Sequence, residues 1–385
     1  MTRHLLYLSI LLPITMLISC RNGIVNNGNA GNLPAGTGNR YASHFSLTRY
    51  DHYTVLDIID PWQGASGVRH RWYLVDKENG DGHITPEDGR VVVVPVKNIV
   101  CMSATHVAMI SALGMAGTIT GVSGIDLVYD PVVRELVDKG LVKEVGYEES
   151  INRELLVRLS PDLIISYGIG GESVAHYSKL DELGLRFLYN AEYLEQEPLG
   201  KAEWIMVFGA LFCLGEKADS IFRASEAEYI KIRDEVTKKG GKRPAVLLGL
   251  PWRDSWFISP GNSYISRLIE DAGGEYLWKD VISELSMPMN LENVYTRAVT
   301  ADYWLNPGTA ESLAQISSTD PRLSSLKVFR RGNIYSNNGR VTISGANDYW
   351  ELGSVRPGLI LKDIASILDE ELFTGDSLVF YRKLK

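Results

Sequence analysis

The sequence predicts an α/β protein of two Rossmann-like lobes with mostly parallel sheets, joined by one long α-helix and preceded by a β-rich extension. Three observations predict this fold class. Short apolar runs alternate with amphipathic helical patterns over residues 96–215, and the same alternation returns over residues 241–385. Between the two series, residues 216–240 carry apolar side chains at helical spacing without a break, as one long helix requires.

The N-terminus has the pattern of a signal peptide over residues 1–19. Arg3 precedes an apolar run over residues 5–17, which is too short for a helix to span a hydrocarbon core of ~30 Å. The following Leu17-Ile18-Ser19-Cys20 resembles the lipobox of bacterial lipoproteins. This resemblance implies a lipid on Cys20 and a periplasmic protein anchored to a membrane; an ordinary signal peptide or a short anchor is the alternative.

Residues 21–40 contain six Asn and five Gly, a composition that predicts a flexible linker between Cys20 and the folded chain. The net charge of −8 argues against nucleic acid as a partner. Cys101 and Cys213 lie in apolar contexts, so we expect two buried free thiols without a disulfide, metal or redox role.

The extension over residues 41–95 reads as β-rich, with strands expected at 53–59, 71–75 and 91–94. Residues 77–88 resemble a calcium loop in their spacing of Asn, Asp and Gly. Lys77 stands at the first ligand position, however, and no flanking helices are evident. We therefore expect a polar hairpin turn there.

The two lobes follow from the alternation of strands and helices, with Ser103 as a helix cap and Gly140 as a helix stop. In the first lobe we expect strands at 99–102, 118–122, 162–166 and 187–189, and helices at 103–113, 131–139, 152–159, 177–183 and 200–213. In the second lobe we expect strands at 245–250, 303–305 and 333–335, and helices at 263–272, 290–298 and 357–368.

Each lobe contains an Asn-x-Glu sequence at the start of a helix, followed by an Asp at the entry to the next strand. The first lobe has Asn152-Arg153-Glu154 and Asp162, and the second has Asn290-Leu291-Glu292 and Asp302. Helix capping explains either copy alone. One exposed carboxylate in each of two similar lobes also suits a partner with twofold symmetry, each carboxylate taking an arginine from one subunit.

Residues 96–372 resemble the class III, helical-backbone, periplasmic substrate-binding proteins of ABC importers for iron–siderophore, haem and cobalamin. The resemblance is carried by the segments 98–105, 120–123 and 152–165. It implies a monomeric receptor without a cofactor, whose Glu154 and Glu292 dock on arginines of a permease dimer coupled to its ATPase. The extension is similar to one found in Bacteroidetes-type versions.

The ligand of such a two-lobed protein is expected in the cleft lined by the loops at the carboxyl ends of the strands. Aromatic walls with an arginine suit a large, flat or anionic metal chelate. The candidate ligand-binding residues in these loops are Tyr147, Tyr167, Trp252, Arg253, Trp256 and Arg340. Tyr349 and Trp350 are expected to pack on the closing helix, and His106 to be a packed histidine rather than a haem ligand.

The function predicted is therefore capture of an iron chelate, a ferric siderophore or haem, and its delivery to an inner-membrane permease. Ser286 and Ile125 occupy positions where the cobalamin-binding branch has aromatic residues, which places cobalamin behind the iron chelates. A sensory or capture lipoprotein without a transporter is a further alternative. An enzyme is disfavoured because the chain lacks Gly-x-Ser-x-Gly, His-Glu-x-x-His and Cys-x-x-Cys.

Overall fold

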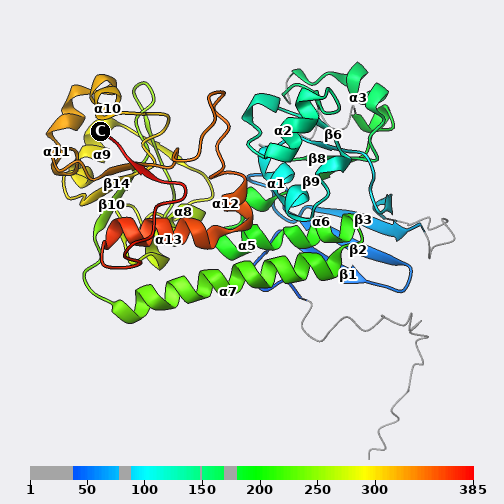
Figure 1. Ribbon diagram of the computed structural model, residues 1–385, viewed down its shortest axis with the longest axis horizontal. Helices are drawn as coiled ribbons and strands as arrows, with labels where there is room; N and C mark the ends of the chain where they lie inside the picture. Colours follow the sequence, from blue (N-terminus) through cyan, green and yellow to red (C-terminus); the bar gives the residue numbers. More distant parts are fainter. Residues whose placement is uncertain (1–37, 78–87, 148–149, 169–179) are drawn as a thin grey trace, which may run out of the picture.

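The computed structural model describes residues 38–77, 88–147, 150–168 and 180–385. Figure 1 shows two α/β lobes side by side, with the long helix α7 (Gly215–Lys239) running beneath both. The predicted fold class is confirmed, because each lobe has a mostly parallel sheet and a separate β-sheet precedes them. The predictions for the signal peptide, Cys20 and most of the linker lie outside the described residues.

The extension forms a sheet of its own with the strand order β1-β2-β3-β4. The strands are β1 (Phe45–Arg49), β2 (Tyr53–Ile59), β3 (Arg69–Asp76) and β4 (Arg90–Val94). The strands expected at 53–59, 71–75 and 91–94 are present, and β1 is an addition. The buried side chains of this sheet belong to the same hydrophobic cluster as the core of the first lobe, so the extension and that lobe fold around one core.

The hairpin expected at residues 77–88 is wrong. β1, β2 and β3 pair antiparallel, but β3 and β4 pair in parallel, with Trp72 opposite Arg90 and Asp76 opposite Val94. A parallel pair requires the chain to return to the other end of the sheet, which a hairpin cannot do. Residues 78–87, which include most of the calcium-loop pattern, lie outside the described residues.

The first lobe has a parallel sheet of order β7-β6-β5-β8-β9. Its central strands are continuous apolar runs because helices cover both faces, as expected for a buried parallel sheet. The strands are β5 (Ile99–Cys101), β6 (Ile119–Val122), β7 (Lys143–Glu144), β8 (Leu163–Ser166) and β9 (Phe187–Tyr189), and the helices are α1 (Ala104–Ala112), α2 (Pro131–Asp138) and α3 (Arg153–Leu159). The helix expected at 177–183 lies partly outside the described residues.

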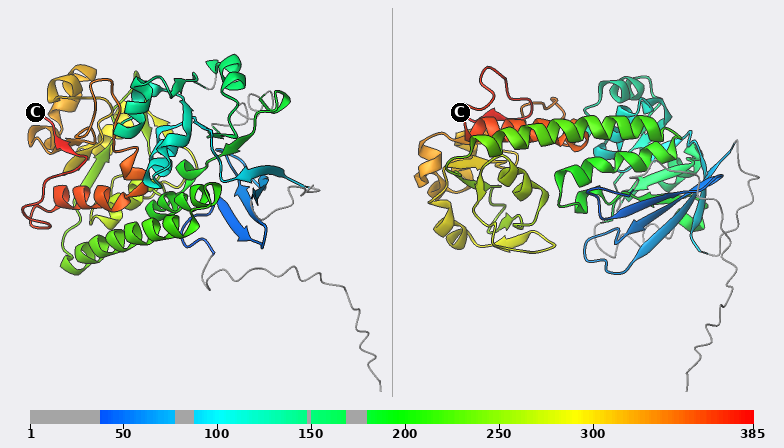
Figure 2. Two further views of the ribbon diagram at one scale, coloured as in Figure 1. Left: turned by 45° about the vertical axis from the view of Figure 1, so that its right-hand side comes forward. Right: turned by 90° about the horizontal axis from the view of Figure 1, so that it is seen from below.

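The helices between the lobes form a continuous floor. The single helix expected at 200–213 is divided at Trp204 into α5 (Pro198–Glu203) and α6 (Ile205–Leu211). Helix α7 follows, has 25 residues and ends at Gly240, whose φ of 61° a glycine adopts without steric cost. Figure 2 shows α7 from below, crossing from one lobe to the other, with the extension sheet beside the first lobe.

The second lobe has the strand order β12-β10-β14-β15-β16, parallel except for β16, and a separate antiparallel pair of β11 and β13. The strands are β10 (Ala245–Leu248), β11 (Trp256–Ile258), β12 (Glu275–Tyr276), β13 (Met287–Met289), β14 (Tyr303–Leu305), β15 (Ile334–Ser336) and β16 (Arg382–Lys383). The helices are α8 (Tyr264–Asp271), α9 (Leu291–Ala298), α10 (Leu313–Thr319), α11 (Lys327–Arg330), α12 (Leu352–Val355) and α13 (Pro357–Leu368).

Cys101 and Cys213 form no disulfide with each other, as predicted. Cys101 is buried, and burial raises the pKa of its thiol. Cys213 is exposed, which corrects the expectation of two buried thiols: it occupies the turn between α6 and α7 with a φ of 56°, outside the apolar faces of both helices. Among the described residues, no helix has the length and apolar character needed to cross a membrane.

Candidate functional site

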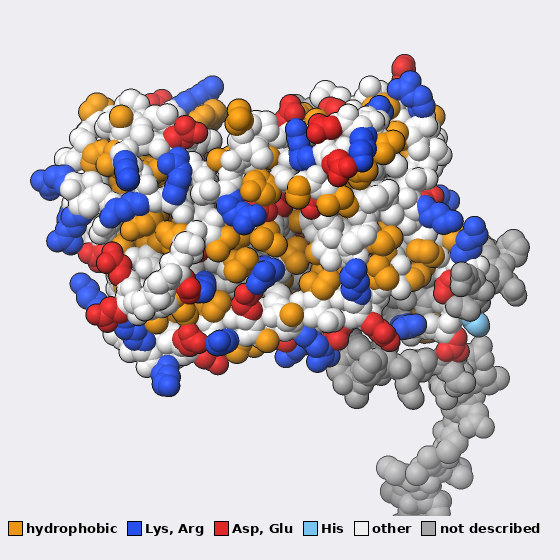
Figure 3. All heavy atoms as spheres, in the orientation of Figure 1, with side chains coloured by type: hydrophobic (Ala, Val, Ile, Leu, Met, Phe, Trp, Pro, Cys, Tyr) orange, Lys and Arg blue, Asp and Glu red, His pale blue; other side chains and the backbone are white. Residues whose placement is uncertain are grey.

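A cavity of ≈ 480 Å³ lies between the two lobes. The first lobe contributes the segment 193–196, which follows β9, and the second contributes Leu248 at the end of β10 and Asn306 directly after β14. The cavity therefore meets the carboxyl ends of parallel strands from both lobes, the position at which open α/β sheets bind ligands. In Figure 3, hydrophobic side chains gather along the junction of the lobes.

The walls of this cavity are mainly uncharged and polar. Lys201 on α5 supplies a cation on its floor, with Nζ 5.4 Å from the centre of the Tyr264 ring. The hydroxyl and amide side chains of the second lobe that line it are Ser259, Asn262, Ser263, Ser283, Ser286 and Asn306. Such a surface offers hydrogen bonds to an oxygen-rich solute, with Lys201 as its cation and Glu195 and Glu284 as its two carboxylates.

The six candidate ligand-binding residues do not line this cavity. Tyr147 (55% exposed) follows β7, and Trp252 (62% exposed) follows β10 with the Arg253 guanidinium 4.3 Å from its ring centre. Tyr167 directly follows β8 and packs partly buried against the core of the first lobe. These four residues stand at the predicted strand ends, but outside the enclosed part of the cleft.

Arg340 and Trp256 are engaged elsewhere in the structure. Arg340 Nε lies 2.8 Å from Asp348 Oδ2. Trp256 is fully buried, stacks on Trp304 at 5.7 Å and donates from Nε1 to the Leu248 carbonyl oxygen at 2.9 Å. Its assignment as a ligand-contacting residue is wrong, because the ring offers no surface to a solute.

Trp350 also differs from its prediction. Trp350 lines the cavity and is 52% exposed. Tyr349 also lines the cavity, but it is buried and its ring packs on Phe380 with the ring centres 5.9 Å apart. The two rings contact each other at 4.8 Å, but only Tyr349 is buried, so only Tyr349 follows the expectation of packing near the closing helix. A signal was present in the sequence, since Asn347, Asp348 and the two rings follow a strand of the second lobe.

His106 is a core residue, as expected. It is fully buried, and desolvation lowers the pKa of its imidazole to about 3. The ring is therefore neutral and has no face open to a haem iron.

Both Asn-x-Glu sequences cap helices as the capping interpretation predicts. Asn152 accepts a hydrogen bond from the Leu155 amide at 3.0 Å, and Asn290 accepts one from the Asn293 amide at 2.9 Å. Glu154 and Glu292 are exposed in the first turns of α3 and α9. Both helices start at the carboxyl-end side of their sheets, so the two carboxylates lie on the side of the cleft.

The two glutamates differ in their surroundings. Glu292 Oε1 lies 3.3 Å from Arg322 Nη1, and Arg322 also binds Asp320. Within the described part of the chain, Glu154 has no such ion pair. Glu154 is thus open to a cation from a partner, while Glu292 shares its charge with an internal arginine.

The chain matches the periplasmic binding protein family over residues 99–340. The chain belongs to the periplasmic binding protein family. As a member, it is a binding protein and not an enzyme. The match begins at β5, so the extension lies outside the part that defines the family.

Solved structures of this family share the fold of the binding protein. A periplasmic haem-binding protein from Pseudomonas aeruginosa superposes with a TM-score of 0.59 at 14% identity, over 75% of this chain and 98% of its own. An Fe3+-hydroxamate transport system protein from Saccharomonospora viridis gives a TM-score of 0.54 at 16% identity, over 71% of this chain and 94% of its own. At these identities the likeness concerns the fold alone.

A lipoprotein of Methanocaldococcus jannaschii, itself uncharacterised, is 26% identical over 93% of this binding protein and 90% of its own length. A match of that length reaches well N-terminal to residue 99. The extension is therefore shared with an archaeal relative and is not restricted to Bacteroidetes-type chains.

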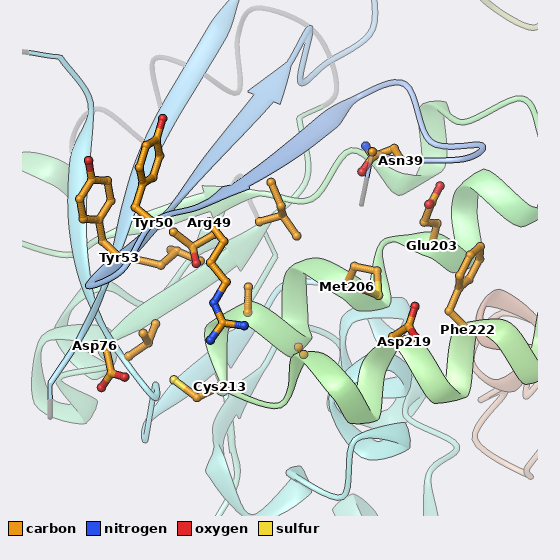
Figure 4. Close-up of a pocket in the computed structure, with 18 of the residues that line it drawn as sticks. Asn39, Arg49, Tyr50, Tyr53, Asp76, Glu203, Met206, Cys213, Asp219 and Phe222 are labelled. Carbon is orange, nitrogen blue, oxygen red and sulfur yellow. The ribbon is translucent and has the colours of Figure 1, made fainter. Parts of the chain in front are cut away.

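A second cavity of ≈ 280 Å³ separates the extension sheet of the binding protein from α6 and α7. Figure 4 shows Arg49 reaching into it from the end of β1, with Met206 and Phe222 on the opposing helices. It meets no strand ends of the second lobe. The interlobe cavity is consequently the better candidate for solute binding.

Proposed function

We propose that this binding protein captures an iron chelate in the interlobe cavity and delivers it to an ABC permease dimer coupled to its ATPase. The cavity between the carboxyl ends of both sheets is the observation that carries the proposal. The lipid expected on Cys20 would keep the receptor at the membrane during delivery.

The lining of the cavity favours a ferric siderophore over haem as the chelate. Hydroxyl and amide groups with Lys201 suit the oxygen atoms of a hydroxamate or catecholate complex. A porphyrin needs broad apolar walls, which this mainly polar lining does not offer, and because His106 is buried a tyrosine of the cavity would have to bind its iron. Ser286 lies in the wall where the cobalamin-binding branch has an aromatic residue, which supports an iron chelate over cobalamin.

Titration identifies the chelate class. The purified protein is titrated with a ferric hydroxamate, a ferric catecholate, haem and cyanocobalamin while tryptophan fluorescence is recorded, because the half-exposed Trp350 reports on the cavity. Saturable quenching by a ferric siderophore at low micromolar concentration or below is expected. If only cyanocobalamin binds saturably, the iron-chelate proposal is wrong and the protein is a cobalamin receptor of the same family.

Docking is tested separately from solute binding. Glu154→Ala combined with Glu292→Ala is expected to abolish uptake while leaving chelate affinity unchanged, because both carboxylates lie outside the cavity. The matched control is Glu216→Ala with Glu235→Ala, two exposed glutamates on α7 beneath the lobes. Normal uptake by the first double variant would refute docking through these residues. Chelate binding without any permease-dependent uptake would favour a sensory or capture lipoprotein.

A further inference from the structure

The loop between β2 and β3 of the extension rests on the first lobe at the end of its central sheet. Trp62 forms a parallel bridge with Gly168, two residues beyond β8. A Cβ atom on Gly168 would lie 2.8 Å from Trp62 Cβ, so only glycine permits this approach. The Trp62 ring packs edge-on against Tyr189 at 5.5 Å, at the end of β9. The loop therefore covers the strand ends that face the cleft.

The shape of this loop is fixed by internal hydrogen bonds. The Val68 amide donates to Asp60 Oδ1 at 2.8 Å, and the Asp60 amide donates to the Val68 carbonyl oxygen at 2.8 Å. The Ala65 amide donates to the Trp62 carbonyl oxygen at 3.0 Å. These contacts close the loop at its base and across its tip, so residues between them keep one position relative to the first lobe.

The extension is also bound to the cavity wall itself. Glu195, which lines the interlobe cavity and is 2% exposed, accepts hydrogen bonds from the backbone amides of Ser43 and His44 at 3.0 Å and from Trp204 Nε1 at 3.0 Å. The residues just before Ser43 are held by Glu203, which accepts hydrogen bonds from the backbone amides of residues 40, 41 and 42 at 2.8 to 2.9 Å. Figure 4 shows Glu203 on its helix close to Asn39. The extension and the wall of the cavity thus form one bonded unit.

Gln63 is the residue through which the extension reaches the cavity. It is partly buried, and of the described residues that line the interlobe cavity it alone comes from the segment before residue 99. No hydrogen bond of its side chain to the described part of the chain is present. The amide therefore keeps both a donor and an acceptor for a bound molecule.

We propose that the extension is part of the solute site: Gln63, held by the loop over residues 60–68, lines the interlobe cavity and contacts the bound chelate as a specificity-determining residue. The inference rests on the proposed function, because it takes an iron chelate as the solute.

The experiment compares Gln63→Ala with Ser66→Ala, an exposed polar residue of the same loop outside the cavity. Both variants and the wild type are titrated with a ferric hydroxamate, a ferric catecholate and haem. Gln63→Ala is expected to weaken the best-bound chelate about tenfold, the effect of one lost hydrogen bond to a polar ligand, whereas Ser66→Ala leaves it unchanged. Gln63→Glu is expected to weaken an anionic chelate further, because it adds a like charge.

The outcomes separate the inference from the function on which it rests. Equal affinity of the wild type, Gln63→Ala and Gln63→Glu for a chelate that the wild type binds would overturn the inference and leave the proposed function intact. A wild type that binds none of the three chelates would overturn both. The Gln63 side chain makes no hydrogen bond within the described residues, so matching thermal midpoints of the variants are expected and are measured alongside.

Discussion

At the scale of single residues, Glu351 is a buried carboxylate that joins the two lobes. It is 2% exposed and accepts hydrogen bonds from the backbone amides of Tyr129 and Asp130, the latter at 2.9 Å. Burial, together with the carboxylates of Asp130 and Asp348, raises the pKa of Glu351 to about 8, although the two amides act in the opposite direction. Arg340 partly offsets this repulsion through its ion pair with Asp348.

The raised pKa of Glu351 predicts a pH dependence of stability. The folded protein holds the proton up to about pH 8, whereas the unfolded chain releases it near the ordinary pKa of 4.5. The contribution of Glu351 to the free energy of unfolding is therefore fully present below pH 4.5. It is lost as the pH rises from 4.5 to about 8, by at most about 1.4 kcal/mol per pH unit. Urea unfolding at pH 5, 6.5 and 8 is expected to show this loss in the wild type and a smaller loss in Glu351→Gln. Parallel curves for the two proteins would contradict the shift.

Arg322 predicts an unequal role for Glu154 and Glu292, the two glutamates that we propose dock on the permease. Because it lies 3.3 Å from Glu292 and carries the same charge as the partner arginine we propose, it opposes docking at the second lobe. Arg322→Ala is expected to tighten association with the permease a few-fold, since an exposed ion pair of this kind contributes about 0–1 kcal/mol. Binding to permease in nanodiscs measures the effect, with the exposed Arg331→Ala as control. Weaker association of Arg322→Ala would show that Arg322 itself contacts the permease.

The direction in which each aromatic side chain of the site points could not be predicted from the sequence. Trp256 and Trp350 both belong to the second lobe, yet Trp256 is fully buried and Trp350 lines the cavity. The difference arises from β11, whose Trp256 and Ile258 point inward while Phe257 between them is 50% exposed. A strand of three residues gives too short an alternation to be predicted, so its inward phase was missed.

At the scale of elements, the cap residues make a quantitative prediction. Asn152 and Asn290 each satisfy one free amide of their helix, at 3.0 and 2.9 Å. Replacement by alanine is expected to cost about 1 kcal/mol at each site, and replacement by serine much less. The two losses are expected to add in the double variant because the sites lie in different lobes. Chemical denaturation measures them, and a loss in Asn→Ser as large as in Asn→Ala would indicate a role other than capping.

The Asp that follows each Asn-x-Glu sequence, Asp162 or Asp302, also has a local structural role. Asp162 Oδ2 accepts from the amides of Lys97 and Asn98 at 2.9 and 3.0 Å, at the start of β5. Asp302 Oδ2 accepts from the Ala245 amide at 3.2 Å, at the start of β10. Each Asp joins the first residues of two neighbouring parallel strands, which explains its place directly before β8 and β14.

Central strands buried on both faces and capped helices could be predicted from the sequence, whereas the short strands at the sheet edges could not. The central strands appear in the sequence as apolar runs, and the capped helices by their periodicity. The edge strands β7, β12 and β16 have two residues each, include Lys or Glu, and carry no pattern. The parallel pairing of β3 with β4 was missed because strand composition does not encode the direction of a neighbour.

At the scale of the whole molecule, the lobes are connected by more than α7. Helix α13 of the second lobe packs along α7, and Tyr41 of the extension contacts the hydrophobic cores of both lobes. On the cleft side, Ser344 Oγ donates to the Asp126 carbonyl oxygen at 2.8 Å, near the contact of Glu351 with Tyr129. Rotation of one lobe against the other would break several of these contacts together.

These connections predict only a small closure on solute binding. A continuous helix resists bending because each of its hydrogen bonds must be strained, whereas an extended strand linker changes two dihedral angles freely. We expect small-angle scattering of the free and the chelate-saturated protein to give nearly the same radius of gyration, and Glu351→Ala to increase the difference by removing an interlobe contact. A contraction of the wild type as large as that of strand-hinged binding proteins would contradict this expectation, because α7 would then have to bend and its contacts with α13 and those of Tyr41 would have to break.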